Sequence, residues 1–201
     1  ERNMKYKFSV IFIALTFSFT SKLTAQRSSN NDSLTICKTV NDFFGCYIGA
    51  INQKSLSEFQ PTFVETKNGK TTLSFTAYFN TLAKYGFSDS LIIKERQSYQ
   101  HCMDELGKIN YSDFKTKFTD LDDFENIECD FSNYYRWTGG QEPIDGIIIK
   151  TVKLNNSFSA TVAIEYFDFN PEEKKNFYWG KNIVIMTKAI DNWEIEDINR
   201  K

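Results

Sequence analysis

A β-hairpin is predicted by the residues IIIKTVKLNNSFSATVAIEYF (147–167), and the rest of the fold assignment builds on it. The part from Ile147 to Leu154 is rich in β-branched side chains, which favour a strand. Asn155-Asn156 is typical of a tight turn, and Phe158 to Phe167 alternates between apolar and polar residues, as a strand with one buried face requires. The two strands are therefore expected to pair in antiparallel orientation.

Two further strands are predicted after this hairpin. Phe169 to Lys175 contains an Asn-Pro pair and several charges, which indicates a loop, and Phe177 to Ala189 indicates a third long strand. Asp191-Asn192 is a turn pair that leads into a fourth strand, Trp193 to Ile198, where apolar and acidic residues alternate. We therefore expect a four-stranded antiparallel meander with one buried face and one face in water.

Three amphipathic helices are predicted in the first half of the chain. The first begins at a cap on Asp32 or Ser33 and ends near Gln53. Residues 54–70 contain Pro61 and Asn68-Gly69 and are expected to form a loop. Two more helices are predicted at about 71–85, ended by a glycine, and at about 88–106. The expected buried positions are Leu34, Cys37, Val40, Phe44, Tyr47, Ile48 and Ile51 in the first helix, Phe75, Tyr78, Phe79 and Leu82 in the second, and Leu91, Ile92, Tyr99, Cys102 and Leu106 in the third.

Helices first and strands afterwards predict an α+β fold, in which three N-terminal helices pack on one face of a curved antiparallel four-stranded sheet. The segment from Asn110 to Asp145 has no assignment, because aromatic and acidic residues are mixed there without a clear period. A loop of this length is uncommon in a compact domain, so the segment is either a functional flap or contains short elements that the pattern does not reveal.

Export is predicted by the N-terminus. Met4 is followed by two lysines, an apolar run from Phe8 to Phe19, and Leu23-Thr24-Ala25, which is the pattern of a secretory leader. The apolar run is shorter than the roughly 20 residues that a membrane-spanning helix needs. We therefore interpret residues 1–26 as a cleavable signal peptide, with 1–3 as an upstream remnant, and 27–201 as a single domain. That domain is expected in the periplasm or outside the cell, with no stable membrane span after cleavage.

The charge of the chain argues against nucleic acid as a partner. The formal net charge is −2, and no block of lysine and arginine is present. Binding to nucleic acid depends on such basic surfaces. A protein or a small ligand is the expected partner.

The four cysteines, Cys37, Cys46, Cys102 and Cys129, all follow the predicted leader. Cys37 and Cys46 lie half a turn apart around one predicted helix, so they cannot bond to each other. A disulfide between Cys102 and Cys129 is the pairing to test first, because it would tie the third helix to the irregular segment. Free thiols in the core are the alternative. No Cys-x-x-Cys motif or Cys-His cluster is present, which disfavours zinc, and no cofactor is expected.

Two patterns of titratable residues are expected to be surface features. His101 falls on the polar side of its predicted helix, one turn before Glu105, so a role in metal binding or proton transfer is disfavoured. The acidic run from Asp120 to Asp130 begins like a calcium loop, but Phe124 occupies a ligand position and Glu125 the position of the required glycine. Neither pattern predicts a metal site.

Tyr134, Tyr135, Arg136 and Trp137 are the candidate residues for binding a partner or a ligand. Aromatic rings beside an arginine are enriched in interfaces and ligand pockets, since they offer a large contact area and directed hydrogen bonds. The alternative is that these rings cover the open end of the sheet core.

The order of three helices and four antiparallel strands, closing on Trp193 to Ile198, resembles the cone-shaped cystatin-like superfamily named for nuclear transport factor two. More narrowly, it is similar to exported bacterial members of unknown function. The resemblance covers roughly Ser33 to Ile198 and implies a sheet wrapped around a cavity. Different members use that cavity as an isomerase or dehydratase pocket, as a ligand site, or as a surface for another protein. No catalytic motif of the superfamily matches here, so no catalytic residue is assigned.

Two functional hypotheses follow. The first is a non-catalytic exported module that binds a protein or a small ligand through the mouth of the cone and the segment 110–145, and an immunity-type protein is one specific form of it. The second is a small enzyme, an isomerase, dehydratase or hydrolase, with a carboxylate or tyrosine in the pocket.

Overall fold

The computed structural model describes residues 30–190 and 192–200, and within them the chain adopts an α+β fold. The predicted signal peptide lies outside this range. A four-stranded antiparallel sheet has the order β3-β4-β5-β6, and a separate sheet consists of β1 and β2. The elements are a first helix at 30–52, β1 (Thr62–Glu65), β2 (Thr71–Ser74), α2 (Thr76–Lys84), α3 (Asp89–Ser98), α4 (Gln100–Leu106), α5 (Tyr111–Lys117), α6 (Leu121–Glu125), β3 (Gly146–Leu154), β4 (Ser159–Asn170), β5 (Lys175–Ala189) and β6 (Asn192–Arg200).

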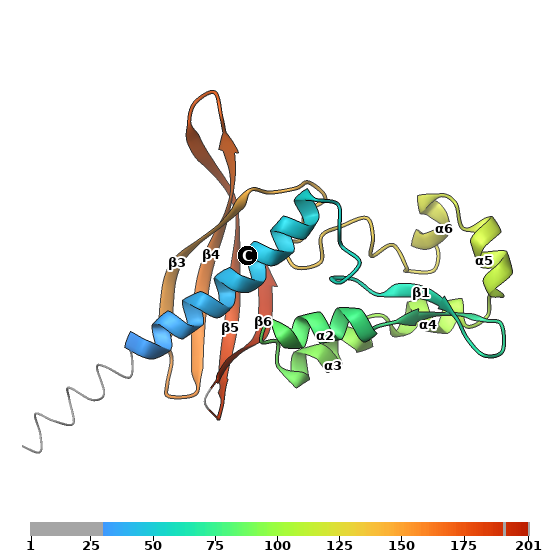
Figure 1. Cartoon of the computed structure of the whole chain (residues 1–201), viewed down its shortest axis with the longest axis horizontal. Helices are drawn as coiled ribbons and strands as arrows, with labels where there is room; N and C mark the ends of the chain where they lie inside the picture. The colour runs from blue at the N-terminus through green and yellow to red at the C-terminus, as the bar shows by residue number, and fades with distance from the viewer. Residues whose placement is uncertain (1–29, 191, 201) are drawn as a thin grey trace, which may run out of the picture.

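The first helix lies across one face of the four-stranded sheet (Figure 1). The alternation predicted for β4 is confirmed, because every second residue from Ala160 to Tyr166 is buried. Phe44 of the helix meets Tyr166 of the sheet with a ring-centroid distance of 6.2 Å. Each large apolar side chain buried at such an interface contributes about 1.5–3 kcal/mol relative to exposure. The helix therefore holds one sheet face away from water.

The start and the apolar stripe of the first helix differ from the prediction. The helix already includes residue 30, so Asp32 is not its cap. Asp32 instead accepts hydrogen bonds from Lys188 Nζ (2.7 Å) and Trp193 Nε1 (2.9 Å), which tie the helix to β5 and β6. Leu34, predicted to be buried, is 69% exposed, whereas the fully buried Phe43 was not assigned to the stripe.

The predicted loop at 54–70 and the start of the predicted second helix form a β-hairpin instead. Thr62 to Glu65 pairs with Thr71 to Ser74, and Gly69 takes a left-handed φ of 76° in the turn. Thr71, Leu73 and Phe75 are buried at every second position, which is a strand period. The helix that follows begins at Thr76 and ends before Gly86, whose φ of 79° is the predicted glycine stop.

The predicted third helix is divided at Tyr99 into α3 and α4. Ser98 Oγ donates to the carbonyl oxygen of Glu95 (2.7 Å), a local bond that competes with the helical pattern. The Tyr99 ring packs edge-on against Phe75 (5.5 Å) and Phe131 (5.4 Å). Packing, rather than glycine or proline, thus breaks this helix.

The segment 110–145 contains two short helices, α5 and α6, that the sequence pattern did not reveal. Their phenylalanines, together with Phe131 after α6, form a small second core with β1. Phe63 lies 4.8 Å from Phe114 and 5.3 Å from Phe131 between ring centroids. β1, β2 and α4 to α6 lie together at the end of the molecule away from the four-stranded sheet (Figure 1).

The β4–β5 hairpin extends beyond its neighbouring strands. β3 pairs with β4 only as far as Phe167, and β6 reaches β5 only as far as Asn182. Residues 168–177 therefore form a two-stranded projection that rises above the sheet (Figure 1), and Tyr178 and Trp179 lie at its base, where Tyr178 pairs with Phe167 beside β3. Residues 168–179 together are called the arm here. The loop predicted at 169–175 was too long, because β4 continues to Asn170 and β5 begins at Lys175. Asn170-Pro171 belongs to the short turn between these strands, where Asn170 Oδ1 accepts a hydrogen bond from the N–H of Glu172 (2.8 Å).

Candidate functional site

A buried carboxylate lies at the centre of the candidate site. Glu95 of α3 is 1% exposed, and Arg136 binds it through two guanidinium nitrogens. Nε lies 3.1 and 3.0 Å from the two carboxylate oxygens, and Nη2 lies 2.7 Å from Oε2. Tyr78 donates to Oε1 at 2.7 Å. Four hydrogen bonds thus compensate the cost of burying this charge.

The pKa values of three side chains around Glu95 are raised. Burial raises the pKa of Tyr78 well above its usual value, and the charge of Glu95 adds to the shift. Burial, followed by the same charge, also raises the pKa of Tyr99. Burial alone lowers the pKa of Arg136, but the hydrogen bonds and charge of Glu95 outweigh it and leave that pKa raised. The tyrosines are therefore neutral donors and Arg136 is a permanent cation near neutral pH.

The backbone of Trp137 is held by three side chains from distant parts of the chain. Its N–H donates to Tyr47 Oη at 3.4 Å, and its carbonyl oxygen accepts from Tyr166 Oη at 3.3 Å and from Asn182 Nδ2 at 3.5 Å. Tyr166 and Asn182 also contact each other through a short hydrogen bond. The first helix and strands β4 and β5 together fix this one residue.

The four predicted binding residues have separate environments. Trp137 is buried, and its ring lies edge-on to Phe87 with a ring-centroid distance of 4.8 Å. It is therefore a core residue, which was the alternative to a binding role. Tyr135 is partly buried and packs against the core. Tyr134 and Arg136 are also partly buried, and together with Trp137 they line a pocket of about 460 Å³. The other residues that line this pocket are Leu91, Gly139, Asp197 and Ile198.

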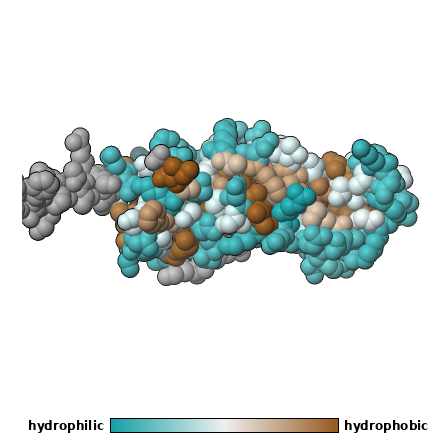
Figure 2. Space-filling view, turned by 90° about the horizontal axis from the view of Figure 1, so that it is seen from below, coloured by the Kyte–Doolittle hydropathy of each residue, from teal (hydrophilic) through white to brown (hydrophobic). Residues whose placement is uncertain are grey.

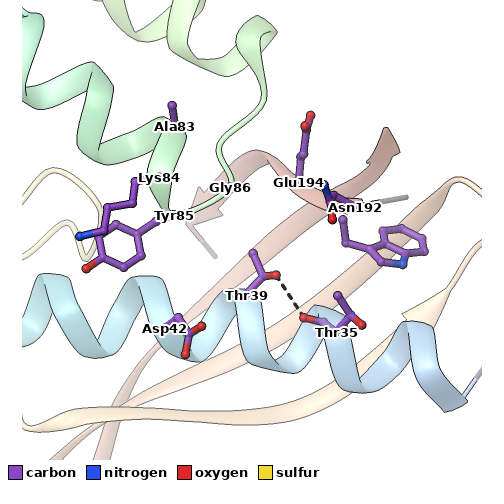
Figure 3. A pocket seen from close by; sticks show the side chains of 10 residues that line it. Thr35, Thr39, Asp42, Ala83, Lys84, Tyr85, Gly86, Asn192 and Glu194 are labelled. Carbon is purple, nitrogen blue, oxygen red and sulfur yellow. Dashed lines mark hydrogen bonds between the residues drawn. The ribbon is translucent and has the colours of Figure 1, made fainter. Parts of the chain in front are cut away.

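A second pocket, of about 320 Å³, lies between the first helix, the end of α2 and β6 (Figure 3). Three of its polar side chains already have partners. Thr39 donates to the carbonyl oxygen of Thr35 at 3.1 Å, Asp42 pairs with Lys38, and Lys84 lies over the Tyr85 ring at 5.3 Å. Asn192 and Glu194 of β6 complete the polar part of its lining.

The arm carries large aromatic side chains in contact with water. Phe169, Phe177, Tyr178 and Trp179 are each between 43% and 49% exposed. Residues alternate between the two faces of a strand, so both faces of the arm carry aromatic rings. At its base, Trp179 packs against Tyr166 with a ring-centroid distance of 5.7 Å. In contrast, the face seen from below in Figure 2 shows its apolar side chains in small separate patches among hydrophilic ones.

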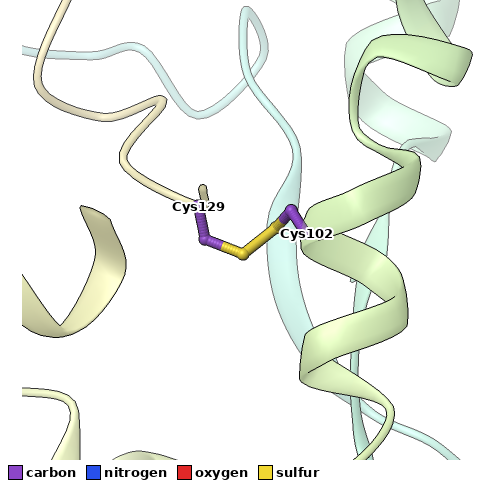
Figure 4. The surroundings of a disulfide bond; sticks show 2 residues. All are labelled: Cys102 and Cys129. Atoms are coloured by element: carbon purple, nitrogen blue, oxygen red, sulfur yellow. A yellow bond between two sulfur atoms is a disulfide. The ribbon is translucent and has the colours of Figure 1, made fainter. Parts of the chain in front are cut away.

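The structure contains the predicted disulfide Cys102–Cys129 (Figure 4). It joins α4 to the segment after α6. Cys37 and Cys46 are free, and the Tyr85 hydroxyl donates to Cys46 Sγ at 2.6 Å. This bond, with some burial and the charge of Cys46, raises the pKa of Tyr85 to about 12.

The two patterns expected to be surface features are on the surface. His101 is exposed, and the carboxylate of Glu105 forms an ion pair with Lys108 (2.5 Å). Asp120 and Asp123 form the capping box of α6. Across residues 30–190 and 192–200, no three His, Cys, Asp or Glu side chains come close enough together to hold a metal ion. The same residues include no helix that is long and apolar enough to cross a membrane.

Comparison with protein-family models, curated proteins and solved structures found no match for this chain.

Glu95 is the central residue that sequence reasoning missed. It lies four residues after Leu91 and four before Tyr99, both of which were assigned to the buried stripe of the third helix. Residues at this spacing share one face of a helix. A carboxylate inside an apolar stripe was therefore the available signal, and it indicates a buried charge that needs a basic partner.

Proposed function

We propose that the protein is an exported, non-catalytic module that binds another protein through the aromatic arm, residues 168–179. The observation that carries the proposal is the half-exposed state of four aromatic rings on the β4–β5 hairpin. Phe169 and Phe177 lie in the part without flanking strands, and Tyr178 and Trp179 lie at its base. A two-stranded hairpin with water on both sides is only marginally stable. Insertion of the arm into a partner would bury both of its faces.

The area is sufficient for recognition. A fully buried aromatic side chain covers 150–250 Å², so four half-exposed rings present roughly 400 Å². This area is divided between the two faces of the arm, so a partner must enclose the arm to bury all of it. Aromatic residues are also those that dominate interface energies.

The charges of the arm indicate what kind of partner fits. Glu172 and Glu173 at its tip are balanced by Lys174 and Lys175, so the arm has no strong net charge there. An apolar groove on another protein suits this composition better than the phosphates of nucleic acid or anionic lipid. Binding is accordingly expected to depend little on salt.

The leader pattern at residues 1–26 supports a periplasmic or extracellular location. The disulfide supports it as well, because disulfides form and persist in oxidising compartments. Membership of the cystatin-like superfamily, with a cone-shaped sheet, remains part of the proposal and is supported by the α+β class and the antiparallel meander. An immunity-type role is one form that the proposed binding would take.

The enzyme hypothesis has weaker support. A catalytic carboxylate must be free to exchange a proton with a substrate. Glu95, the buried carboxylate beside the pocket, is occupied by Arg136 and Tyr78.

The test is site-specific photocrosslinking in the source organism. A photoreactive residue at Tyr178 should form one discrete adduct with a different protein. The same residue at Phe158, which is 69% exposed on the turn between β3 and β4, is the matched control and should give none. Adding Phe177→Ser should reduce affinity for the purified partner at least tenfold at both low and high salt. Equal labelling from both positions, or adducts only between copies of this chain, would overturn the proposal.

A further inference from the structure

The four-stranded sheet has a second face, on the side away from the first helix. Val184 of β5 is fully buried on the helix side, so its neighbours Ile183 and Ile185 point to the other side. Ala163 of β4 pairs with Ile183, and Ile148 of β3 lies on the same side, one row further along. Within the described residues, these four side chains are partly buried and do not pack against the hydrophobic core. They form the centre of what we call the outer sheet face.

Strands β3 and β5 are apolar toward both faces of the sheet. A strand with one wet face alternates between apolar and polar residues, whereas a strand that is covered on both faces carries a continuous apolar run. Residues 147–149 of β3 are three isoleucines, and residues 183–186 of β5 are all apolar. The first helix lies over the inner face (Figure 1), and these runs favour a second layer over the outer sheet face.

Two charged side chains without ion-pair partners lie at opposite edges of the outer sheet face. The pairing register forms one row across the sheet, from Lys153 of β3 through Thr161 and Ile185 to Asp197 of β6. Among the described residues, neither Lys153 nor Asp197 takes part in an ion pair. The two edge strands are three strand spacings apart, about 14 Å, so these two charges do not pair within one copy.

A second copy of this chain supplies the opposite charge at both edges. In a two-fold dimer whose axis runs parallel to the strands, between β4 and β5, β3 of each copy lies over β6 of the other. Lys153 of one copy then faces Asp197 of the other, and symmetry forms the same contact twice. At the centre, Ala163 of one copy faces Ile183 of the other. Packed sheets lie about 10 Å apart with their strands at about 30°, a separation that a lysine and an aspartate side chain span together.

The row that contains Glu165 limits this contact. Glu165 pairs with Lys150 at 3.2 Å and with Lys181 at 3.0 Å, which leaves one excess positive charge in this row of each copy. A dimer would bring these positive charges together, so we expect the contact to end at this row. The arm lies beyond Glu165 along β4 and β5 and therefore stays free for the different protein proposed above.

The area of the outer sheet face is adequate for a weak dimer. From Ser159 to Glu165 it spans four rows about 6.8 Å apart on four strands about 4.8 Å apart, which gives roughly 500 Å² in each copy. The total of about 1,000 Å² is near the lower limit of specific interfaces. We propose that the outer sheet face is the contact surface of a symmetric homodimer that forms at micromolar concentration, with Lys153 of each copy paired with Asp197 of the other. This surface is separate from the arm, so the inference goes beyond the binding role proposed above.

The first measurement is sedimentation equilibrium of the folded, disulfide-bonded protein over a range of concentrations. The native protein should show a monomer–dimer equilibrium. Lys153→Asp places like charges at both edges of the dimer and should weaken association at least tenfold. Lys153 is exposed, so this variant should keep its fold and its melting temperature. Lys67→Asp, the same change on the exposed turn between β1 and β2, is the control and should have no effect on association.

Mixing two variants tests the proposed pairing itself. Asp197→Lys should also self-associate weakly, because each of its copies carries a lysine at both positions. In a heterodimer of Lys153→Asp with Asp197→Lys, both edges bring opposite charges together, so the mixture should associate about as strongly as the native protein. Asp197 Oδ1 accepts from the N–H of Ile198 at 2.9 Å, so circular dichroism should first establish that Asp197→Lys is folded.

The inference would be wrong if the native protein remained a monomer up to millimolar concentration, if Lys153→Asp dimerised normally, or if the mixture associated no better than either variant alone. Phe177→Ser on the arm should leave the dimer unchanged, and loss of the dimer in that variant would place the contact on the arm instead. A protein that is always a monomer but still crosslinks to a different protein through Tyr178 would contradict this inference and leave the role of the arm standing.

Discussion

Replacing Arg136 by methionine removes the cation that pairs with Glu95 while keeping a side chain of similar length. In the native protein Glu95 is 1% exposed and accepts three hydrogen bonds from Arg136 and one from Tyr78. The variant leaves the carboxylate buried with the hydroxyls of Tyr78 and Tyr99 as its remaining donors. We expect a large loss of stability for this reason, rather than through lost packing.

The size of the loss follows from the burial of the two partners. Breaking a buried ion pair by removing one partner costs about 3–5 kcal/mol. Arg136 is 36% exposed, so water can partly take its place, and the lower end of that range applies. A loss of about 3 kcal/mol lowers the midpoint of thermal unfolding by roughly 6–12 °C in a domain of this size.

A second variant separates the charge from the shape. Glu95→Gln combined with Arg136→Met still accepts the hydrogen bond from Tyr78 but buries no charge. This double variant should recover about 1–2 kcal/mol of the loss, since an uncompensated ion is costlier than a partly satisfied amide. Arg96→Met, one residue after Glu95, is the control. Its guanidinium lies 5.5 Å from the Phe75 ring centroid at the surface, and its removal should cost at most about 1 kcal/mol.

The assay is urea unfolding followed by circular dichroism, with the slope of the transition checked for each variant. A loss below about 1 kcal/mol for Arg136→Met would refute the reasoning, as would a double variant no more stable than the single one.

Two further predictions concern the other long-range links. Replacing both Cys102 and Cys129 by alanine should lower the free energy of unfolding by roughly 3.5 kcal/mol, because the bond joins residues 27 positions apart and restricts the unfolded chain. Cys37→Ala is the control, and an equal effect of the two changes in calorimetry would contradict this account. Hydrogen bonds from Lys188 and then Trp193 lower the pKa of Asp32 below 3.8, so the ionised carboxylate stabilises the fold above that pH and the stabilisation disappears as the pH falls further. Asp32→Asn should therefore reduce the melting temperature near neutral pH and approach the native protein at about pH 2, whereas a constant difference would argue against the linkage.

The alternation of apolar and polar residues along the chain was enough to predict much of the four-stranded sheet. The alternation of β4 and the burial of Trp193 and Ile195 in β6 follow directly from residue type at every second position. These strands are long, and one face of each meets the core, so pattern and structure agree. The α+β class was predicted on the same basis.

The β1–β2 hairpin could not be predicted in this way. Each strand has four residues, which is too short to separate a strand period from a helix period. Thr71 and Leu73 were read as the start of a helix because Phe75 and Tyr78 continue the apolar pattern into α2. Tertiary pairing of the two short strands decides their conformation.

The candidate site was predicted in part. The sequence identified Arg136 and its aromatic neighbours, but the partner of Arg136 lies 41 positions earlier in α3. A pairing across that distance depends on how α3 packs against the segment before β3, and no local pattern records it. The same is true of Asp197, which shares a pocket with Arg136 only because the end of β6 passes beside it.

The backbone of Trp137 has a consequence for the folding pathway. Its three anchors lie 90, 29 and 45 positions away along the chain, on the first helix, β4 and β5. Contacts of such long range form late, since the intervening loops must first lose their freedom. In refolding experiments, tryptophan fluorescence at this position should therefore be the last signal to reach its native value. In a ribosome-bound chain that ends before β5, the carbonyl group of Trp137 would lack its hydrogen bond from Asn182.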